Sequence, residues 1–256
     1  MISVVLPTYN ETPTIVEFLH NLMEVLDTWG EEYEIWVMDD ASPDGTAQLV
    51  EDTYQEKTEV HVVRRTGIKG LGVAIEDGLG RVQGDKVVVM DSDFNHDARV
   101  VPYLVKLLSD FDVVVGSRFA PGGGMYSKFR HFGSFGINVI LRIVLRTQIQ
   151  DNLCGFFAIR KEGLQKLPRE RIFWGYGDYF FRLLFFALRI PLRILEIPVV
   201  YQSRKGGESK TGLVKTSCRY LYEIFHLKYQ YWQKPIPEAP PLEYRYKWPI
   251  RSKFED

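Results

Sequence analysis

An apolar run that ends in two aspartates constrains the fold of this chain more than any other stretch. Val87-Val88-Val89-Met90 is followed directly by Asp91-Ser92-Asp93. Because the run does not alternate between apolar and polar residues, it predicts a strand that is buried on both faces. Unpartnered carboxylates are costly to bury, so we place the pair at the exposed carboxyl end of the strand, where open α/β sheets bind ligands.

The spacing of the two acids indicates what they could hold. In an extended segment, residues two apart direct their side chains to the same face. A divalent cation bound with a nucleotide diphosphate needs one or two such carboxylates together with phosphate oxygens. The alternative, on this triplet alone, is a loop whose acid caps the next helix.

Strands alternate with helices along the first half of the chain. We expect strands at residues 2–6, 34–38, 60–63, 86–90 and 113–116, each followed by polar residues. This alternation predicts a three-layer α/β/α, Rossmann-like fold whose parallel sheet has one functional edge. Thr12-Pro13 is interpreted as the start of a helix that continues to about Trp29. A later strand is expected from Leu192 to Tyr201.

Length and charge narrow the class of protein. The 256 residues suffice for one α/β domain with an appendage, and a net charge of -1 argues against nucleic acid as a partner. The two cysteines form no disulfide framework or metal-binding spacing. No basic leader follows Met1, and no uncharged apolar run reaches the ~18 residues of a spanning helix. We therefore expect no signal peptide and no transmembrane helix.

Four polar strand exits converge on the predicted functional edge: Pro7 to Glu11, Asp39 to Thr46, Asp91 to Asp93, and Gly116-Ser117-Arg118. In this order they resemble the family 2 glycosyltransferases of the GT-A fold, and among these the dolichol-phosphate mannose synthases and their polyprenyl-phosphate relatives. The resemblance implies a catalytic domain over residues 1–212, with an acceptor loop and interface helix at 119–147 and a mobile loop at 202–212. An amphipathic helix and a Pro-rich, aromatic tail would follow over 213–256.

The resemblance also implies a nucleotide-sugar pocket. Tyr9 can pack on the base, and carboxylates can accept hydrogen bonds from base N–H groups or ribose hydroxyls. The implied pocket residues are Pro7, Tyr9, Glu11, Val37, Asp39, Asp91 and Ser92. Local alternatives are a first-turn helix acid for Glu11, and turn or cap roles for Asp40 and Asp44.

A metal site is implied next to this pocket. Asp91 and Asp93 would bind Mg²⁺ or Mn²⁺, and Asn95 stands where close relatives carry a glutamine. His96 is interpreted as loop structure, because a phosphate-bound hard cation prefers oxygen ligands. Asp97 is interpreted as an N-cap.

Three basic residues are implied contacts of the donor diphosphate. Arg118 follows a buried strand and is expected at the same edge, where its guanidinium would neutralise phosphate oxygens. Arg204 and Lys210 belong to a segment that matches the family pattern Arg-x-x-Gly-x-Ser-Lys. With Asp93, these three form the predicted catalytic set. The alternative for the segment is a solvated basic loop.

The segment from about Arg130 to Arg146 predicts a helix that is apolar over most of its circumference. Its polar residues recur every four positions: Arg130, Ser134, Asn138, Arg142 and Arg146. Such a helix is buried or lies in lipid, and its basic stripe suits an anionic head group. The resemblance assigns Arg130, Ser134 and Asn138 to the acceptor phosphate. A core helix whose arginines pair with acids remains the alternative.

The predicted reaction is transfer of a hexose, with GDP-mannose as the favoured donor, to dolichyl or polyprenyl phosphate with inversion. Two departures from the family leave the sugar and acceptor open: Phe157 replaces an arginine, and Asp178 and Arg182 lie where synthases carry a glutamate. One alternative is transfer to a hydroxyl on a saccharide or lipid-linked glycan, with Asp178 as the base. A lesser one is a non-catalytic subunit that binds nucleotide sugars.

The predicted surroundings follow from this substrate. Aromatic residues and basic residues in the last helix, about Leu213 to Trp232, suit a membrane interface. We expect peripheral attachment to the cytoplasmic face of a membrane, either directly or through an anchoring subunit.

Overall fold

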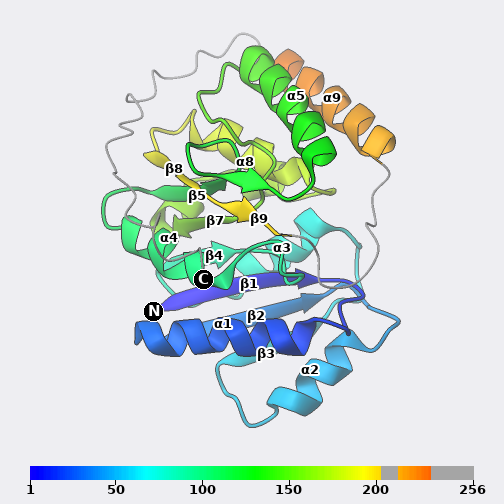
Figure 1. The fold of residues 1–256 in the computed structure, drawn as a ribbon, viewed down its shortest axis with the longest axis vertical. Coiled ribbons are helices and arrows are strands. Elements are labelled where there is room, and N and C mark those ends of the chain that lie inside the picture. Colours follow the sequence, from blue (N-terminus) through cyan, green and yellow to red (C-terminus); the bar gives the residue numbers. More distant parts are fainter. Residues whose placement is uncertain (203–212, 232–256) are drawn as a thin grey trace.

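The computed structural model describes residues 1–202 and 213–231, and its centre is one large sheet (Figure 1). The sheet has seven strands in the order β3-β2-β1-β4-β7-β5-β8. Strand β7 runs antiparallel to both of its neighbours, and the other pairs are parallel. The strands are β1 (Ile2–Thr8), β2 (Tyr33–Asp39), β3 (Val60–Arg64), β4 (Lys86–Val89), β5 (Val113–Ser117), β7 (Phe157–Arg160) and β8 (Ile194–Pro198).

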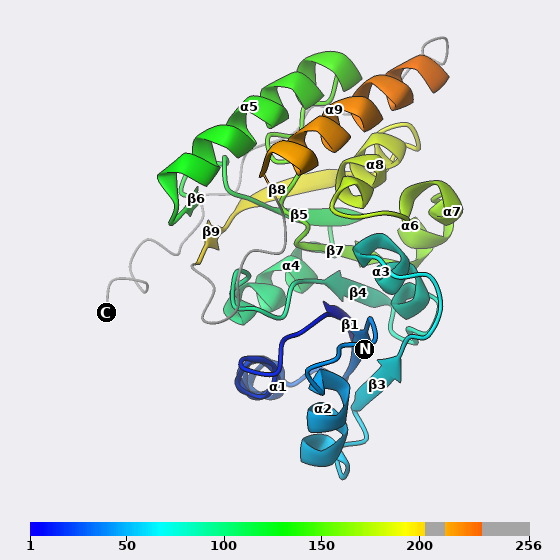
Figure 2. The ribbon, with the colours of Figure 1, turned by 90° about the vertical axis from the view of Figure 1, so that its right-hand side faces the viewer.

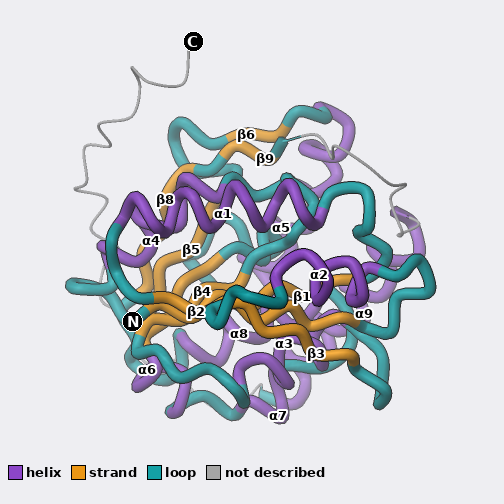
Figure 3. Tube along the Cα trace, turned by 90° about the horizontal axis from the view of Figure 1, so that it is seen from below, coloured by secondary structure: helices purple, strands orange, loops and turns teal. Residues whose placement is uncertain are grey.

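Helices cover both faces of this sheet, which gives the predicted three layers. Helices α1 and α4 lie on one face, and α3, α7 and α8 lie on the other (Figure 3). The helices are α1 (Ile15–Trp29), α2 (Thr46–Tyr54), α3 (Leu71–Leu79), α4 (Val101–Leu107), α5 (Lys128–Leu145), α6 (Lys161–Gln165), α7 (Arg169–Ile172), α8 (Asp178–Ala187) and α9 (Leu213–Gln230), with the short 3₁₀ helix η1 (Ala98–Val100).

The non-alternating apolar runs form buried central strands, as the sequence predicts. In β4, Val87, Val88 and Val89 are buried, and in β5 all five residues are buried. The predicted strand 192–201 is wrong in one respect, because it is two strands. Strand β8 ends at Pro198, and β9 (Val200–Tyr201) leaves the main sheet to pair with β6 (Gly124–Met125).

The predicted start of the first helix is also wrong. Helix α1 begins at Ile15, after Thr14, rather than at Thr12-Pro13. The Thr12 backbone N–H donates to Asp44 Oδ2 over 3.1 Å, and the Glu11 N–H donates to Thr46 Oγ1 over 3.0 Å. These bonds hold residues 11 and 12 against the start of α2, and the Thr12 hydroxyl donates to the Asp44 carbonyl over 3.1 Å, so it does not cap α1.

Two long helices lie beside one another beyond the β8 edge of the sheet. Helices α5 and α9 are in contact along their lengths (Figure 2). Each exposes large aromatic side chains, which are Phe129, Phe132 and Phe135 on α5 and Tyr222, Phe225 and Tyr229 on α9. Over the ranges 1–202 and 213–231, no helix has both the length and the apolar character needed to cross a membrane.

We expect Gly78→Ala to lower the free energy of unfolding by about 1–3 kcal/mol, because it overpacks the contact of α3 with β1. A Cβ at Gly78 would lie 2.5 Å from Cγ1 of the buried Val5. Urea denaturation measures the effect. Gly136→Ala on α5, where a Cβ meets nothing within 4 Å, is the control and should be neutral or stabilising by about 1 kcal/mol. An unchanged midpoint for Gly78→Ala would contradict this packing.

Candidate functional site

The carboxyl ends of β1, β2, β4 and β5 meet at one edge of the sheet. All four strands point the same way, so the segments after Thr8, Asp39, Val89 and Ser117 emerge together. Polar residues of these segments hydrogen-bond to one another. Ser42, after β2, accepts the Asn10 N–H over 3.0 Å and donates its own N–H to Asp39 over 2.9 Å.

The predicted nucleotide residues lie in this region with different exposure. Tyr9 is exposed, and the Lys69 ammonium lies 5.7 Å from its ring centroid. Pro7 is half-buried, Asp39 and Glu11 are buried, and Val37 lies in the core of β2. The structure thus offers an exposed ring with an adjacent cation, and two buried carboxylates in the same strand-end region.

The chain bends over Ser92 to His96, directly after Asp91, so the extended segment that the sequence predicts is wrong. Phe94 has a positive φ of 66° and packs edge-to-face on Phe18, with ring centroids 5.3 Å apart. This turn leads the chain into η1, where Asp97 caps the helix by accepting the Arg99 N–H, as predicted.

The bend gives the two aspartates different environments. The Asp91 side chain is 35% exposed, whereas Asp93 and Ser92 are buried. Asn95 donates its backbone N–H to Asp93 Oδ1 over 3.0 Å and its amide to Oδ2 over 2.7 Å. No group of three or more His, Cys, Asp or Glu that could hold a metal occurs within the described part of the chain. Two carboxylates and an amide oxygen nevertheless fit a cation that takes its remaining ligands from phosphate and water.

His96 supports this bend from beneath. Its Nδ1 accepts the Asp91 N–H over 2.9 Å, so the ring proton resides on Nε2, which lies 3.3 Å from the Cys154 carbonyl oxygen. Burial lowers the pKa of His96 to about 4, and the ring is therefore neutral near pH 7. The structure places His96 as loop support, which is the role interpreted from the sequence.

Arg118 is held in a buried ion pair that the sequence did not predict. It donates Nε–H and Nη2–H to the two oxygens of Asp151, over 2.7 and 2.8 Å. Burial alone would lower the pKa of Arg118, but the Asp151 carboxylate outweighs it and raises the pKa. Two backbone hydrogen bonds hold Asp151 in place. Its N–H donates to the Glu196 carboxylate, and its own carboxylate accepts the Arg118 backbone N–H. The sequence signal that could have indicated this pair is Asp151 itself, an acid that follows shortly after a helix rich in arginine.

The predicted acceptor residues of α5 occupy three different positions. Arg130 is exposed at the start of the helix, whereas Ser134 accepts a hydrogen bond from Arg118 Nη2 over 3.0 Å. Asn138 is buried, and its amide oxygen accepts the Asn152 N–H over 2.7 Å. Its amide nitrogen donates to the Ser134 carbonyl over 3.0 Å. The structure therefore gives Asn138 a bridging role between α5 and the segment before β7.

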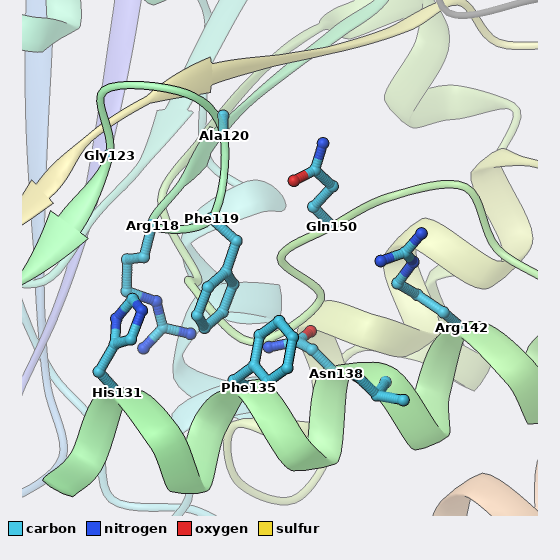
Figure 4. Close-up of a pocket in the computed structure, with 10 residues that line it drawn as sticks. Arg118, Phe119, Ala120, Gly123, His131, Phe135, Asn138, Arg142 and Gln150 are labelled. Atoms are coloured by element: carbon cyan, nitrogen blue, oxygen red, sulfur yellow. The ribbon is translucent and has the colours of Figure 1, made fainter. Parts of the chain in front are cut away.

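A cavity of about 320 Å³ opens between α5 and the loop after β5 (Figure 4). Arg118 and His131 line one end of it, and Arg142 and Gln150 line the other. The wall between them combines the apolar Phe119, Ala120, Phe135 and Val139 with the polar Asn138. The cavity therefore suits an anionic group attached to an apolar chain.

Asp178 lies in a buried cluster at the start of α8. Its Oδ2 accepts from Arg182 over 2.6 Å and from Arg219 over 3.2 Å, and its Oδ1 accepts the Tyr176 N–H over 2.8 Å. The carboxylate is fully buried, and both of its oxygens are occupied by hydrogen bonds within this cluster. It is therefore in no position to take a proton from an acceptor hydroxyl. The predicted phosphate contacts Arg204 and Lys210 lie outside the described residues.

Solved structures define the class of fold. The chain superposes on glucosyl-3-phosphoglycerate synthase of Mycobacterium tuberculosis, solved with Mn²⁺, uridine diphosphate and glucosyl-3-phosphoglycerate, with a TM-score of 0.65 and 24% identity over 90% of this chain and 79% of that one. A mannosyltransferase of Pyrobaculum calidifontis, solved with GDP-Man and Mn²⁺, gives a TM-score of 0.63 and 23% identity over 94% of this chain and 66% of that one. The fold is the predicted GT-A fold.

Sequence comparison gives the family. The model described as glycosyl transferase family 2 matches residues 3–168, and the chain belongs to this family. It is 35% identical to the dolichol-phosphate mannosyltransferase of Pyrococcus furiosus over 88% of this chain, and it spans 63% of the length of that enzyme. It is 34% identical to the undecaprenyl-phosphate mannosyltransferase of Micrococcus luteus, over 80% of this chain and 85% of that enzyme.

We expect Asp151→Asn to lower the free energy of unfolding by about 3–5 kcal/mol, because the buried Arg118 charge would lose its partner. Asp97→Asn, whose partner Arg99 is exposed, is the control and should cost about 1 kcal/mol. Denaturant unfolding of both variants measures the difference. Equal losses would show that the Arg118–Asp151 pair stabilises the fold no more than a surface pair.

Proposed function

We propose that this protein transfers a hexose from a nucleotide diphosphate sugar to dolichyl or polyprenyl phosphate, with GDP-mannose as the donor. The observation that carries the proposal is the cavity between Arg118 and Arg142, because it combines guanidinium groups with apolar side chains, as a phosphate on a hydrocarbon chain requires. The names of the two mannosyltransferase relatives support the same reaction.

The proposed chemistry needs no general base. A phosphate monoester is largely ionised near neutral pH, since its second pKa is about 6. Its oxygen forms the new bond to the anomeric carbon while the bond from that carbon to the donor diphosphate breaks, which inverts the configuration. The nucleoside diphosphate leaves with the electron pair. The burial of Asp178 disfavours the hydroxyl-acceptor alternative, which needs it as a base.

The residues at the sheet edge would divide this work. Asp91 and Asp93, supported by Asn95, would hold Mg²⁺ or Mn²⁺, which stabilises charge on a departing diphosphate. Tyr9, Asp39 and their neighbours would bind the nucleotide. Arg118, which the sequence assigns to the donor diphosphate, lines the cavity and would instead position the acceptor phosphate together with Ser134. Arg204 and Lys210 stay as proposed contacts of the diphosphate.

We also propose that the protein acts at the cytoplasmic surface of a membrane. The α5 side chains Phe129 and Phe132 are 78% and 73% exposed. The exposed Lys128 and Arg130 flank Phe129 in the sequence of the same helix. Aromatic and basic residues together favour an interface with anionic lipids. A polyprenyl phosphate resides in such a surface, so α5 would meet its substrate there.

We expect transfer of mannose from GDP-mannose to a short polyprenyl phosphate when Mn²⁺ or Mg²⁺ is present, and none after chelation. Asp93→Ala should lower kcat by about a hundred- to a thousandfold, because the diphosphate loses its cation. Asp97→Asn in the same segment is the control and should keep most of the activity. The assay compares a panel of nucleotide sugars and both phosphate and hydroxyl acceptors. Unchanged transfer by Asp93→Ala would contradict the mechanism.

We expect the protein to co-sediment with anionic liposomes without a second subunit. Replacing both Phe129 and Phe132 by Ser should weaken liposome binding by about tenfold or more, because two aromatic side chains would no longer be buried in the lipid surface. Ile68→Ser is the control, since Ile68 is 79% exposed but lies in the loop before α3. If the wild-type chain stays in the supernatant, direct attachment is wrong and an anchoring subunit is required.

A further inference from the structure

Tyr201 lies between the proposed metal site and the proposed acceptor cavity. It is the last residue of β9, which leaves the main sheet after the Val199 N–H bonds to the Ser117 carbonyl over 3.0 Å. The next residue is fixed to the acidic bend, because the Gln202 N–H donates to the Asn95 carbonyl over 3.2 Å. The backbone therefore places this tyrosine against the bend that carries Asp91.

The Tyr201 hydroxyl contacts Asp91 directly. Its oxygen lies 3.3 Å from Asp91 Oδ2 and 3.4 Å from the Cys154 carbonyl oxygen. One hydroxyl has one proton to donate, and a carboxylate is the stronger acceptor. The Cys154 carbonyl already accepts from His96 Nε2. The geometry therefore favours donation to Asp91.

Asp91 is thus held at both ends. His96 accepts its backbone N–H, and Tyr201 donates to its carboxylate. The two supporting rings meet edge-to-face, with centroids 5.0 Å apart and an interplanar angle of 87°. His96 in turn stacks on Phe156 at 4.7 Å. A carboxylate restrained in this way needs little further ordering when it binds a cation.

The ring of Tyr201 also contacts the residue that lines the acceptor cavity. The Arg118 guanidinium carbon lies 5.1 Å from the Tyr201 ring centroid, within the range of a cation–π contact. Arg118 then bonds to Ser134 on α5. A continuous series of contacts therefore joins α5 to Asp91 through Arg118 and Tyr201.

We propose that Tyr201 is a positioning residue with two separable tasks. Its hydroxyl orients the Asp91 carboxylate for the cation, and its ring keeps Arg118 in place at the acceptor cavity. This inference rests on the proposed function, and it deepens that function by naming a residue that supports the donor side and the acceptor side together.

Two substitutions separate the tasks. Tyr201→Phe removes only the hydroxyl, so it should weaken Mn²⁺ binding by about tenfold, as loss of an outer partner of a metal ligand does, and leave the KM for polyprenyl phosphate unchanged. Tyr201→Leu removes the ring as well, so it should also raise that KM by about threefold. Mn²⁺ binding at saturating GDP is measured by electron paramagnetic resonance.

Tyr179→Phe is the matched control. Its buried hydroxyl lies 3.3 Å from the Gly155 carbonyl, one residue beyond Cys154, and should be removable without a change in Mn²⁺ affinity. Tyr201→Phe with wild-type Mn²⁺ affinity would overturn the inference and leave the proposed function intact. A wild-type protein that binds GDP but no Mn²⁺ would overturn the metal assignment, and the role of Tyr201 with it.

Discussion

The buried pair of Arg118 and Asp151 is the interaction on which the site depends. Ion pairs that leave water must be complete, because a single buried charge costs several kcal/mol. Here the pair joins the end of β5 to the segment before β7, and Arg118 extends the connection to Ser134 on α5. Asp151 continues it to Glu196 in β8. The long helix, the reversed strand and the sheet edge are therefore positioned by one set of charged hydrogen bonds.

The arrangement of strands and helices could be predicted from local patterns of apolar and polar residues in the sequence. Non-alternating apolar runs became central strands, and polar residues at their ends met at one edge, because parallel strands with helical connections allow little else. The acidic pair after β4 was placed correctly at that edge. The bend over Ser92 to His96 was not predicted, because it includes a positive φ at Phe94, whose ring packs against Phe18 of α1, and no local pattern shows that contact.

Hydrogen bonds and ion pairs between residues far apart in the chain could not be predicted from the sequence. The stripe from Arg130 to Arg146 is visible as a period of four, yet nothing local shows that Asn138 bonds to Asn152 while Arg130 is exposed. Asp178 resembled a base on the sequence, and only the positions of Arg182 and Arg219 show that it is an internal counter-ion. Periodicity assigns a residue to a face, whereas its partner is chosen by tertiary packing.

The cluster around Asp178 joins α9 to the rest of the fold. Arg219 of α9 contacts Asp178, and Glu223 of α9 contacts Arg182. Separating α9 would therefore leave Asp178 and Arg182 each without one of its oppositely charged partners. The same cluster fixes the Gly175 turn, whose carbonyl accepts the Gly72 N–H at the start of α3. A continuous series of contacts therefore runs from α9 through Asp178 and the Gly175 turn to the start of α3, so the position of α9 is coupled to a loop at the other side of the sheet.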